Sequence, residues 1–180
     1  GSRRLCTLLL TALTLIAALA GCSEEKKAAP PPVAMTGESV GHYCGMLLRE
    51  HPGPKGQIIL EKNPDQPVWF SSVRDTLIFT RLPEEPKDIL AIYVSDMGKA
   101  PSWDQPGDTN WMAAHDGFFV IGSRQQGGMG GAEAVPFSEE SAALAFTQAQ
   151  GGRIVRFDEA AELMAAPQDG DAGAAEETTP

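Results

Sequence analysis

Three side chains that can bind metal ions stand at alternate positions in the segment HYCGM: His42, Cys44 and Met46. If this segment is extended, residues two apart project from the same face, with neighbouring Cα atoms about 6.5–7 Å apart. Metal–thiolate bonds are on the order of 2.3 Å long, so the sulfurs of Cys44 and Met46 can lean toward one ion. Spacing alone leaves open the alternative that Cys44 is buried and chemically inert.

A third sulfur lies in the glycine-rich segment GGMGG, where Met129 has two glycines on each side. Its thioether has few neighbours from its own segment and is free to reach outward, although a loop methionine can also fill a gap in a core. One thiolate and two thioethers form a soft donor set, which favours Cu(I) over Zn(II). Because thioether bonds carry no charge and exchange readily, we expect such a site to pass its ion on.

The first residues of the chain have the pattern of an export signal. Arg3 and Arg4 precede a short apolar run that ends in LAGC, which predicts a lipoprotein signal peptide over residues 1–21 and lipidation of Cys22. An ordinary signal peptide cut nearby, with Cys22 incidental, is the alternative. Ser23 follows the cysteine, which by resemblance to known sorting rules indicates the outer membrane.

If the chain is exported and lipidated as predicted, one cysteine thiol remains without an assigned role. Cys6 is removed with the signal and Cys22 carries lipid, so Cys44 remains alone. Thiols normally pair in an oxidising compartment, and an odd one calls for a reason. It is buried as a small apolar residue, paired between chains, or held by a soft metal.

The two ends of the exported chain have the composition of linkers. Residues 22–39 contain lysines, alanines and three consecutive prolines, which predicts a semi-stiff tether. Residues 166–180 contain no large apolar residue and are expected to be disordered. Signal cleavage lowers the basic residues from 14 to 12 against 24 acidic ones, a net charge of −12. This balance argues against nucleic acid and against adsorption on anionic lipid.

An internal repeat indicates the fold. The segments WFSSVRDTLIFT (69–80) and PFSEESAALAFT (136–147) are identical at five of twelve positions with a constant offset of 67. Each follows expected strands and precedes another, so each half reads as strand, strand, helix, strand. We therefore expect an α+β protein of two small homologous lobes packed together, the first over residues 40–100 and the second over 101–165.

Both repeat copies contain a helix-start signal. Ser72 is followed by Asp75, and Ser138 by two glutamates, so a hydroxyl can cap the first N–H groups of each helix. The carboxylates then lie near the positive end of the helix dipole. The signal predicts that Ser72 and Ser138 are the N-terminal caps of the two repeated helices.

Enzyme signatures are missing from the sequence. It contains no Gly-x-Ser-x-Gly elbow, no His-Glu-x-x-His helix and no Cys-x-x-Cys pair. Cys44 with His42, His51 or His115 matches no known cysteine-hydrolase signature. GGMGG lacks the Lys-Ser/Thr that completes a phosphate loop. We therefore expect a protein that is not an enzyme.

HYCGM, followed by GGMGGAEAVPFSEESAALAFTQAQGGRIVRF, resembles the NosL family of lipoprotein copper chaperones. The resemblance covers the lipobox and nearly all of residues 40–165. It implies one bound Cu(I), with the family's copper-binding cysteine and methionine on Cys44 and Met46 and its later methionine on Met129. His42 is a nearby donor whose participation the resemblance leaves open.

The same resemblance implies a cellular location and protein partners. It implies a periplasmic, lipid-anchored protein of denitrification that delivers copper for the copper–sulfide cluster of nitrous-oxide reductase. Delivery in this family proceeds through the membrane-anchored NosDFY ABC-transporter complex. Which surface docks there is not implied, and acidic residues near Met129, such as Glu133, are the candidates for an exposed contact.

Two other interpretations remain. The chain can be a membrane-tethered interaction or scaffold lipoprotein in which the Cys44 thiol is buried and binds nothing. Thiol-dependent chemistry on an organometallic or sulfur compound is the other, but it requires a second catalytic group, and the sequence offers none.

Overall fold

The computed structural model describes residues 28–167. The expected signal peptide over 1–21, the lipidation site Cys22 and residues 168–180 of the expected tail lie outside the described residues. Within the described range, no helix combines the length and the apolar composition that a membrane crossing requires.

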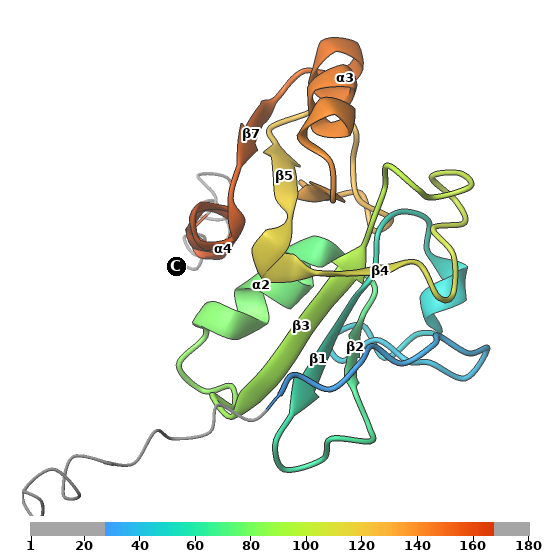
Figure 1. Ribbon diagram of the computed structural model, residues 1–180, viewed down its shortest axis with the longest axis vertical. Helices are drawn as coiled ribbons and strands as arrows, with labels where there is room; N and C mark the ends of the chain where they lie inside the picture. Colours follow the sequence, from blue (N-terminus) through green and yellow to red (C-terminus); the bar gives the residue numbers. More distant parts are fainter. Residues whose placement is uncertain (1–27, 168–180) are drawn as a thin grey trace, which may run out of the picture.

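The first lobe is an antiparallel sheet with one helix packed on it. Four strands form the sheet, in the order β2 (Val68–Phe70), β1 (Gly56–Leu60), β3 (Ile89–Ser95) and β4 (Trp111–Ala113). Helix α2 (Val73–Arg81) connects β2 to β3 and packs on one face of the sheet (Figure 1). All five residues of β1 are buried, as expected of a central strand covered on both faces.

The second lobe repeats this arrangement on a smaller scale. Its antiparallel strands lie in the order β6 (Val135–Phe137), β5 (Phe118–Ile121) and β7 (Arg153–Val155). Helix α3 (Glu140–Gln150) connects β6 to β7. In both lobes the first strand lies between the second and the third, and a helix follows the second. The predicted α+β fold of two strand-strand-helix-strand lobes is confirmed.

One hydrophobic core joins the two lobes. It contains Phe70 of the first sheet, Phe119 of the second, and one side of helix α4 (Phe157–Ala165). Helix α4 lies against α2 (Figure 1), with Ala160 and Ala161 fully buried. Small side chains at these positions let the helices approach closely. Helix α4 was not predicted, although its buried residues recur at i, i+3, i+4 and i+7, because nine residues are a short stretch for such a pattern.

The two helix-start signals have different outcomes. Ser72 caps α2 as predicted, since its Oγ accepts the Asp75 N–H at 3.0 Å. The prediction for Ser138 is wrong: α3 begins after Glu139 without a side-chain cap. The Ser138 hydroxyl donates instead to the carboxylate of Asp96, which is buried at the end of β3. A buried carboxylate needs strong donors, and this need outweighs the capping preference.

Part of the expected tether is docked on the first sheet. The Gln57 amide accepts the Val33 N–H and donates to the Val33 carbonyl, both at 2.9 Å. Tyr93 donates to the backbone of the same segment. Side chains alternate along a strand, so Gln57 and Tyr93 lie on the face opposite to α2. Residues 30–35 therefore cover the second face of this sheet, where we expected free linker.

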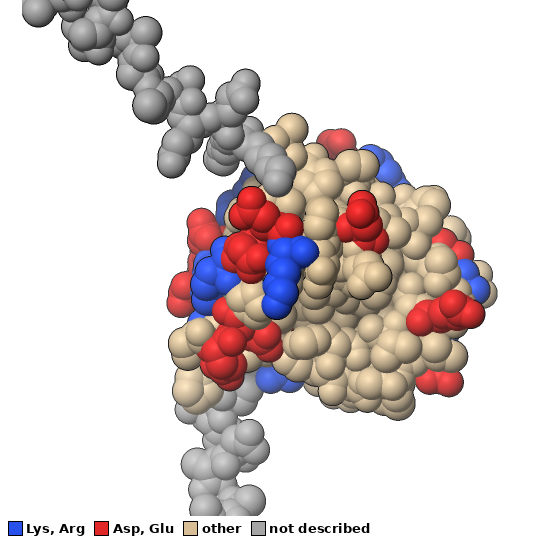
Figure 2. Space-filling view, turned by 90° about the horizontal axis from the view of Figure 1, so that it is seen from below, with Lys and Arg blue, Asp and Glu red and all other residues tan. Residues whose placement is uncertain are grey.

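Charged side chains are unevenly distributed over the surface. Figure 2 shows that, on the face seen from below, acidic and basic side chains mix and gather mainly toward one side. A broad neighbouring area of that face carries few of them. Contacts made by this area are therefore dominated by uncharged groups.

Candidate metal centre

The segment HYCGM forms a tight turn. The Gly41 N–H donates to the Met46 carbonyl, and the Gly45 N–H donates to the Gly41 carbonyl, both at 2.9 Å. Gly45 has a φ of +67°, a conformation that glycine adopts without strain. The expectation of an extended segment is wrong, and alternate side chains do not form a row on one face.

Ser71 brings two of the predicted sulfur ligands together. It lies between the end of β2 and the cap of α2, and its side chain is buried. Its Oγ is 3.4 Å from Cys44 Sγ and donates to Met129 Sδ at 3.5 Å. The two sulfurs therefore flank one oxygen atom. Small side-chain movements can bring both to a single ion, since metal–sulfur bonds are on the order of 2.3 Å long.

Cys44 is a free thiol in a half-buried position. Gly41 provides the space for it, because a Cβ at Gly41 would lie 2.5 Å from Cys44 Sγ. Any other residue would force the sulfur or the turn to move. The thiol also lies 4.0 Å from the Met46 carbonyl, so its position is defined from two sides.

The two predicted thioether ligands are both exposed. Met129 is 53% exposed and Met46 40%, which is unusual for large apolar side chains. Met129 reaches Ser71 from a loop of the second half of the chain. Met46 belongs to the same turn as Cys44, but its side chain extends into solvent. The structure thus brings Cys44 and Met129 to the same hydroxyl and leaves the Met46 side chain exposed on the Cys44 turn.

His42 is held by other partners. Its Nε2 lies 3.4 Å from Glu85 Oε1, and its ring packs edge-on against Phe70 and Phe79. The Tyr43 hydroxyl donates to the same Glu85 oxygen at 2.8 Å. For His42 to bind an ion through Nε2, its contact with Glu85 must first break.

The carboxylate of Glu133 caps helix α2 from a distant part of the chain. Its Oε1 accepts the N–H groups of Arg74 and Ala134 at 2.8 and 2.9 Å, and its Oε2 accepts that of Val73 at 3.3 Å. Glu133 is 3% exposed, so its expected role as an exposed docking residue is wrong. Burial raises the pKa of Glu133 to about 7, although the three N–H groups oppose this by stabilising the carboxylate.

A second buried charge lies nearby. Lys55 is 1% exposed, and its Nζ donates to the three carbonyls of residues 51–53 at 2.7, 3.1 and 2.7 Å. Burial lowers the pKa of Lys55 to about 8, while negative charge on Glu133 and Cys44 raises it. The ammonium of Lys55 therefore supplies positive potential beneath the sulfur site.

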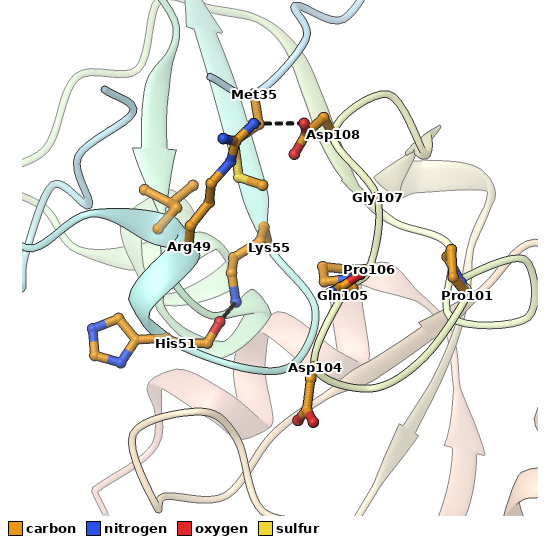
Figure 3. A pocket seen from close by; sticks show the side chains of 11 residues that line it. Met35, Arg49, His51, Lys55, Pro101, Asp104, Gln105, Pro106, Gly107 and Asp108 are labelled. Carbon is orange, nitrogen blue, oxygen red and sulfur yellow. Dashed lines mark hydrogen bonds and ion pairs between the residues drawn. The ribbon is translucent and has the colours of Figure 1, made fainter. Parts of the chain in front are cut away.

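A cavity of about 420 Å³ borders Lys55 but not the sulfurs. Figure 3 shows the Lys55 ammonium directed at the His51 carbonyl and Arg49 paired with Asp108, at 2.6 Å. None of the predicted sulfur ligands lines this cavity. A smaller cavity of about 170 Å³ includes Met129 in its wall. The donor chemistry, not the larger cavity, identifies the site.

Three polar residues at or near the sulfurs were not identified from the sequence. Ser71 was visible only as one of the identities in the internal repeat, aligned with Ser138. Lys55 immediately precedes a buried strand, but lysines are rarely buried, so the sequence carries no signal that this one is. The role of Glu133 depends on a contact with residues about sixty positions away, which no local pattern records.

The fold and the site together define a two-lobed α+β protein with a surface site of soft sulfur donors. A sequence model of the NosL family matches residues 32–165. The chain therefore belongs to the NosL family, and the resemblance seen in HYCGM and GGMGG is confirmed.

Individual relatives agree with this assignment. The chain is 49% identical over 150 residues to the copper-binding lipoprotein NosL of Achromobacter cycloclastes, an alignment that covers 83% of this chain and 77% of that protein. It is 34% identical over 152 residues to the protein of the same name from Stutzerimonas stutzeri, with the same coverage. The crystal structure of the copper chaperone NosL from Shewanella denitrificans superposes with a TM-score of 0.67 at 37% identity, covering 72% of this chain and 96% of that one.

Replacement of Gly41 by alanine should displace the Cys44 thiol. The added Cβ would lie 2.5 Å from Sγ, so the sulfur must leave Ser71 and move toward solvent. We expect a several-fold faster alkylation of Cys44 in the native, metal-free protein. Gly37→Ala is the matched control, because its Cβ would make only an ordinary contact. Equal alkylation rates in the wild type and Gly41→Ala would contradict the described turn.

The free energy of unfolding of the wild type should decrease as the pH rises toward neutrality, because Glu133 ionises. The pKa of this carboxyl is raised from 4.5 to about 7, so the folded state keeps a proton that the unfolded state loses. The resulting stabilisation is complete below pH 4.5 and disappears as the pH rises through 7. Denaturant unfolding across this range should show a steeper decline in the wild type than in Glu133→Gln, in which the raised pKa of Asp75 still contributes. Parallel pH profiles would exclude the raised pKa.

Proposed function

We propose that this protein is a Cu(I)-binding metallochaperone and not an enzyme. The observation that carries the proposal is the position of the Cys44 and Met129 sulfurs on either side of the Ser71 hydroxyl. Met46 lies in the same turn as Cys44 and supplies a further thioether. A donor set of this softness suits monovalent copper. Further support comes from relatives that are described as copper-binding and as a copper chaperone.

The proposed donor atoms are suited to reversible binding of Cu(I). The Cys44 thiolate supplies the single negative charge that Cu(I) requires, and neutral thioethers complete the coordination. Exposure of Met46 and Met129 leaves the ion accessible to an incoming ligand from an acceptor protein. Copper is then the cargo, bound strongly enough to be carried and openly enough to be passed on. His42 becomes an additional donor only after release from Glu85.

The proposed location is the periplasmic face of a membrane, with the lipid on Cys22. The relatives from two organisms are described as lipoproteins, which supports this anchor. Ser23 favours the outer membrane. Residues 30–35 are docked on the first sheet, so few residues separate the folded domain from an anchor at Cys22.

The proposed recipient is the NosDFY ABC-transporter complex and, through it, the copper–sulfide cluster of nitrous-oxide reductase. Exposed apolar side chains surround Cys44 in its own turn, among them Val40, Tyr43 and Leu47. Clustered apolar exposure of this kind is typical of surfaces that contact another protein. Docking through this turn would put the acceptor next to the bound ion.

The alternative is a scaffold lipoprotein with a buried thiol that binds nothing. Cys44 is only half-buried, and its neighbours include an exposed thioether, so it does not have the surroundings of a core residue. This observation favours the chaperone, and copper uptake separates the two functions.

The reduced protein should bind one Cu(I) per chain, with sulfur-to-copper charge-transfer absorption. Cys44→Ser should abolish tight binding and Met129→Ala should weaken it, because the first removes the anionic ligand and the second a neutral one. Affinity should increase with pH, since the thiol must lose its proton. Competition with a coloured Cu(I) chelator measures these effects. Undiminished affinity in Cys44→Ser would refute the proposed site.

Replacement of Leu47 by aspartate should separate copper binding from delivery. Leu47 is exposed and is not a predicted ligand, so Cu(I) affinity should remain while transfer to the purified NosDFY complex slows. Leu144→Asp on α3 is the control, because Leu144 is equally apolar, is exposed, and lies in the other lobe. Equal transfer rates for the two variants would show that this turn is not the docking surface.

A further inference from the structure

The loop that carries Met129 has little regular structure of its own to position it. Its backbone closes on itself through two bonds, Gly127 N–H to the Gly131 carbonyl and Gly130 N–H to the Gly127 carbonyl, both at 2.9 Å. Met129 has a glycine on each side and is more than half exposed. A thioether on such a loop can serve as a precise ligand only if the two ends of the loop are fixed by the rest of the protein.

One side of this loop rests on the turn organised by Lys55. Gly128 lies so close to Pro52 that an added Cβ would be 2.2 Å from the Pro52 carbonyl oxygen. That carbonyl is one of the three that accept a hydrogen bond from the buried Lys55 ammonium. Lys55 therefore shapes the wall against which the loop packs.

The other side is fastened by Glu133. A Cβ on Gly127 would lie 3.3 Å from Glu133 Oε2, so the carboxylate also packs against the first residue of the loop. The same carboxylate accepts the N–H groups of Val73 and Arg74, at the first turn of α2. Ser71, which contacts both sulfurs, is two residues before Val73. Glu133 thus connects the segment that carries Met129 to the segment that carries Ser71.

We propose that Glu133 is a positioning residue of the sulfur site: it holds the Met129 loop against the start of α2, so that the Met129 and Cys44 sulfurs meet at Ser71. The inference rests on the proposed copper site, whose ligands it supports without touching the ion. A carboxyl group is well suited to this task, because its two oxygens can accept the unpaired N–H groups at the start of a helix.

The simpler explanation is that Glu133 only stabilises α2. The structure offers a matched control, because Ser72 caps the same helix through the Asp75 N–H and has no hydrogen bond to the Met129 loop. Ser72→Ala should lower the stability of α2 without disturbing the loop. Glu133→Gln keeps the size of the side chain but replaces one acceptor oxygen with an NH₂ group. Glu133→Ala removes all three acceptor contacts.

The test measures Cu(I) affinity by chelator competition on the full chain. We expect Glu133→Ala to weaken affinity by roughly 10- to 100-fold, as is usual for residues that support a ligand, and Glu133→Gln to weaken it less. In a Met129→Ala background, the Glu133 substitutions should have no further effect, since the ligand they position is gone. Ser72→Ala should keep wild-type affinity. X-ray absorption should show one sulfur fewer around copper in Glu133→Ala.

A second readout needs no copper. Peroxide oxidation of Met129 and amide hydrogen exchange at residues 127–131 should both be faster in Glu133→Gln and unchanged in Ser72→Ala. If the wild type binds no Cu(I), the proposed function fails, and this readout still decides whether Glu133 holds the loop. Unchanged loop exchange in Glu133→Gln would overturn the inference. So would an equal loss of affinity with and without Met129.

Discussion

The hydroxyl of Ser71 is the point on which the sulfur site depends. Around this single oxygen meet the turn that carries Cys44, the start of α2, and the loop that carries Met129. A hydroxyl suits this position because it both donates and accepts, so it satisfies a thiol and a thioether together. The sulfurs are held close to one another without being buried as core side chains.

The surrounding fold makes this arrangement possible by fixing the three segments separately. The Cys44 turn is closed by its own backbone hydrogen bonds, and Gly41 leaves space for the thiol. The start of α2 is fixed by Ser72 and Glu133. The lobes share one hydrophobic core, to which α4 contributes, so segments far apart in the chain keep a constant separation.

The site combines exposed ligands with buried supports. The two proposed thioether ligands lie at the surface, where an ion can enter and leave, whereas Lys55 and Glu133 are nearly inaccessible to solvent. Buried charges are costly, and both pKa values move toward neutrality as a result. Such a cost is tolerated where the charges organise backbone groups that apolar side chains cannot hold.

Much of the fold was predictable because it is local and repeated. Strand and helix patterns extend over a few residues each, and the offset of 67 between WFSSVRDTLIFT and PFSEESAALAFT indicated two equivalent lobes. The exceptions have physical reasons. The apolar pattern of α4 extends over only nine residues, and the Ser138 hydroxyl donates to the buried carboxylate of Asp96.

Residue types and spacing alone indicated which atoms can bind a soft metal: one thiol without an expected partner and two thioethers next to glycines. They also indicated the two lobes, since hydrophobic period and turn residues act over short distances. The three-dimensional fold was needed to show that HYCGM is a turn, that His42 lies against Glu85, and that Ser71 contacts both the Cys44 and the Met129 sulfur. The contacts of His42 and Ser71 join segments that are distant in the sequence, and the turn depends on backbone hydrogen bonds; neither produces a hydrophobic period along the chain.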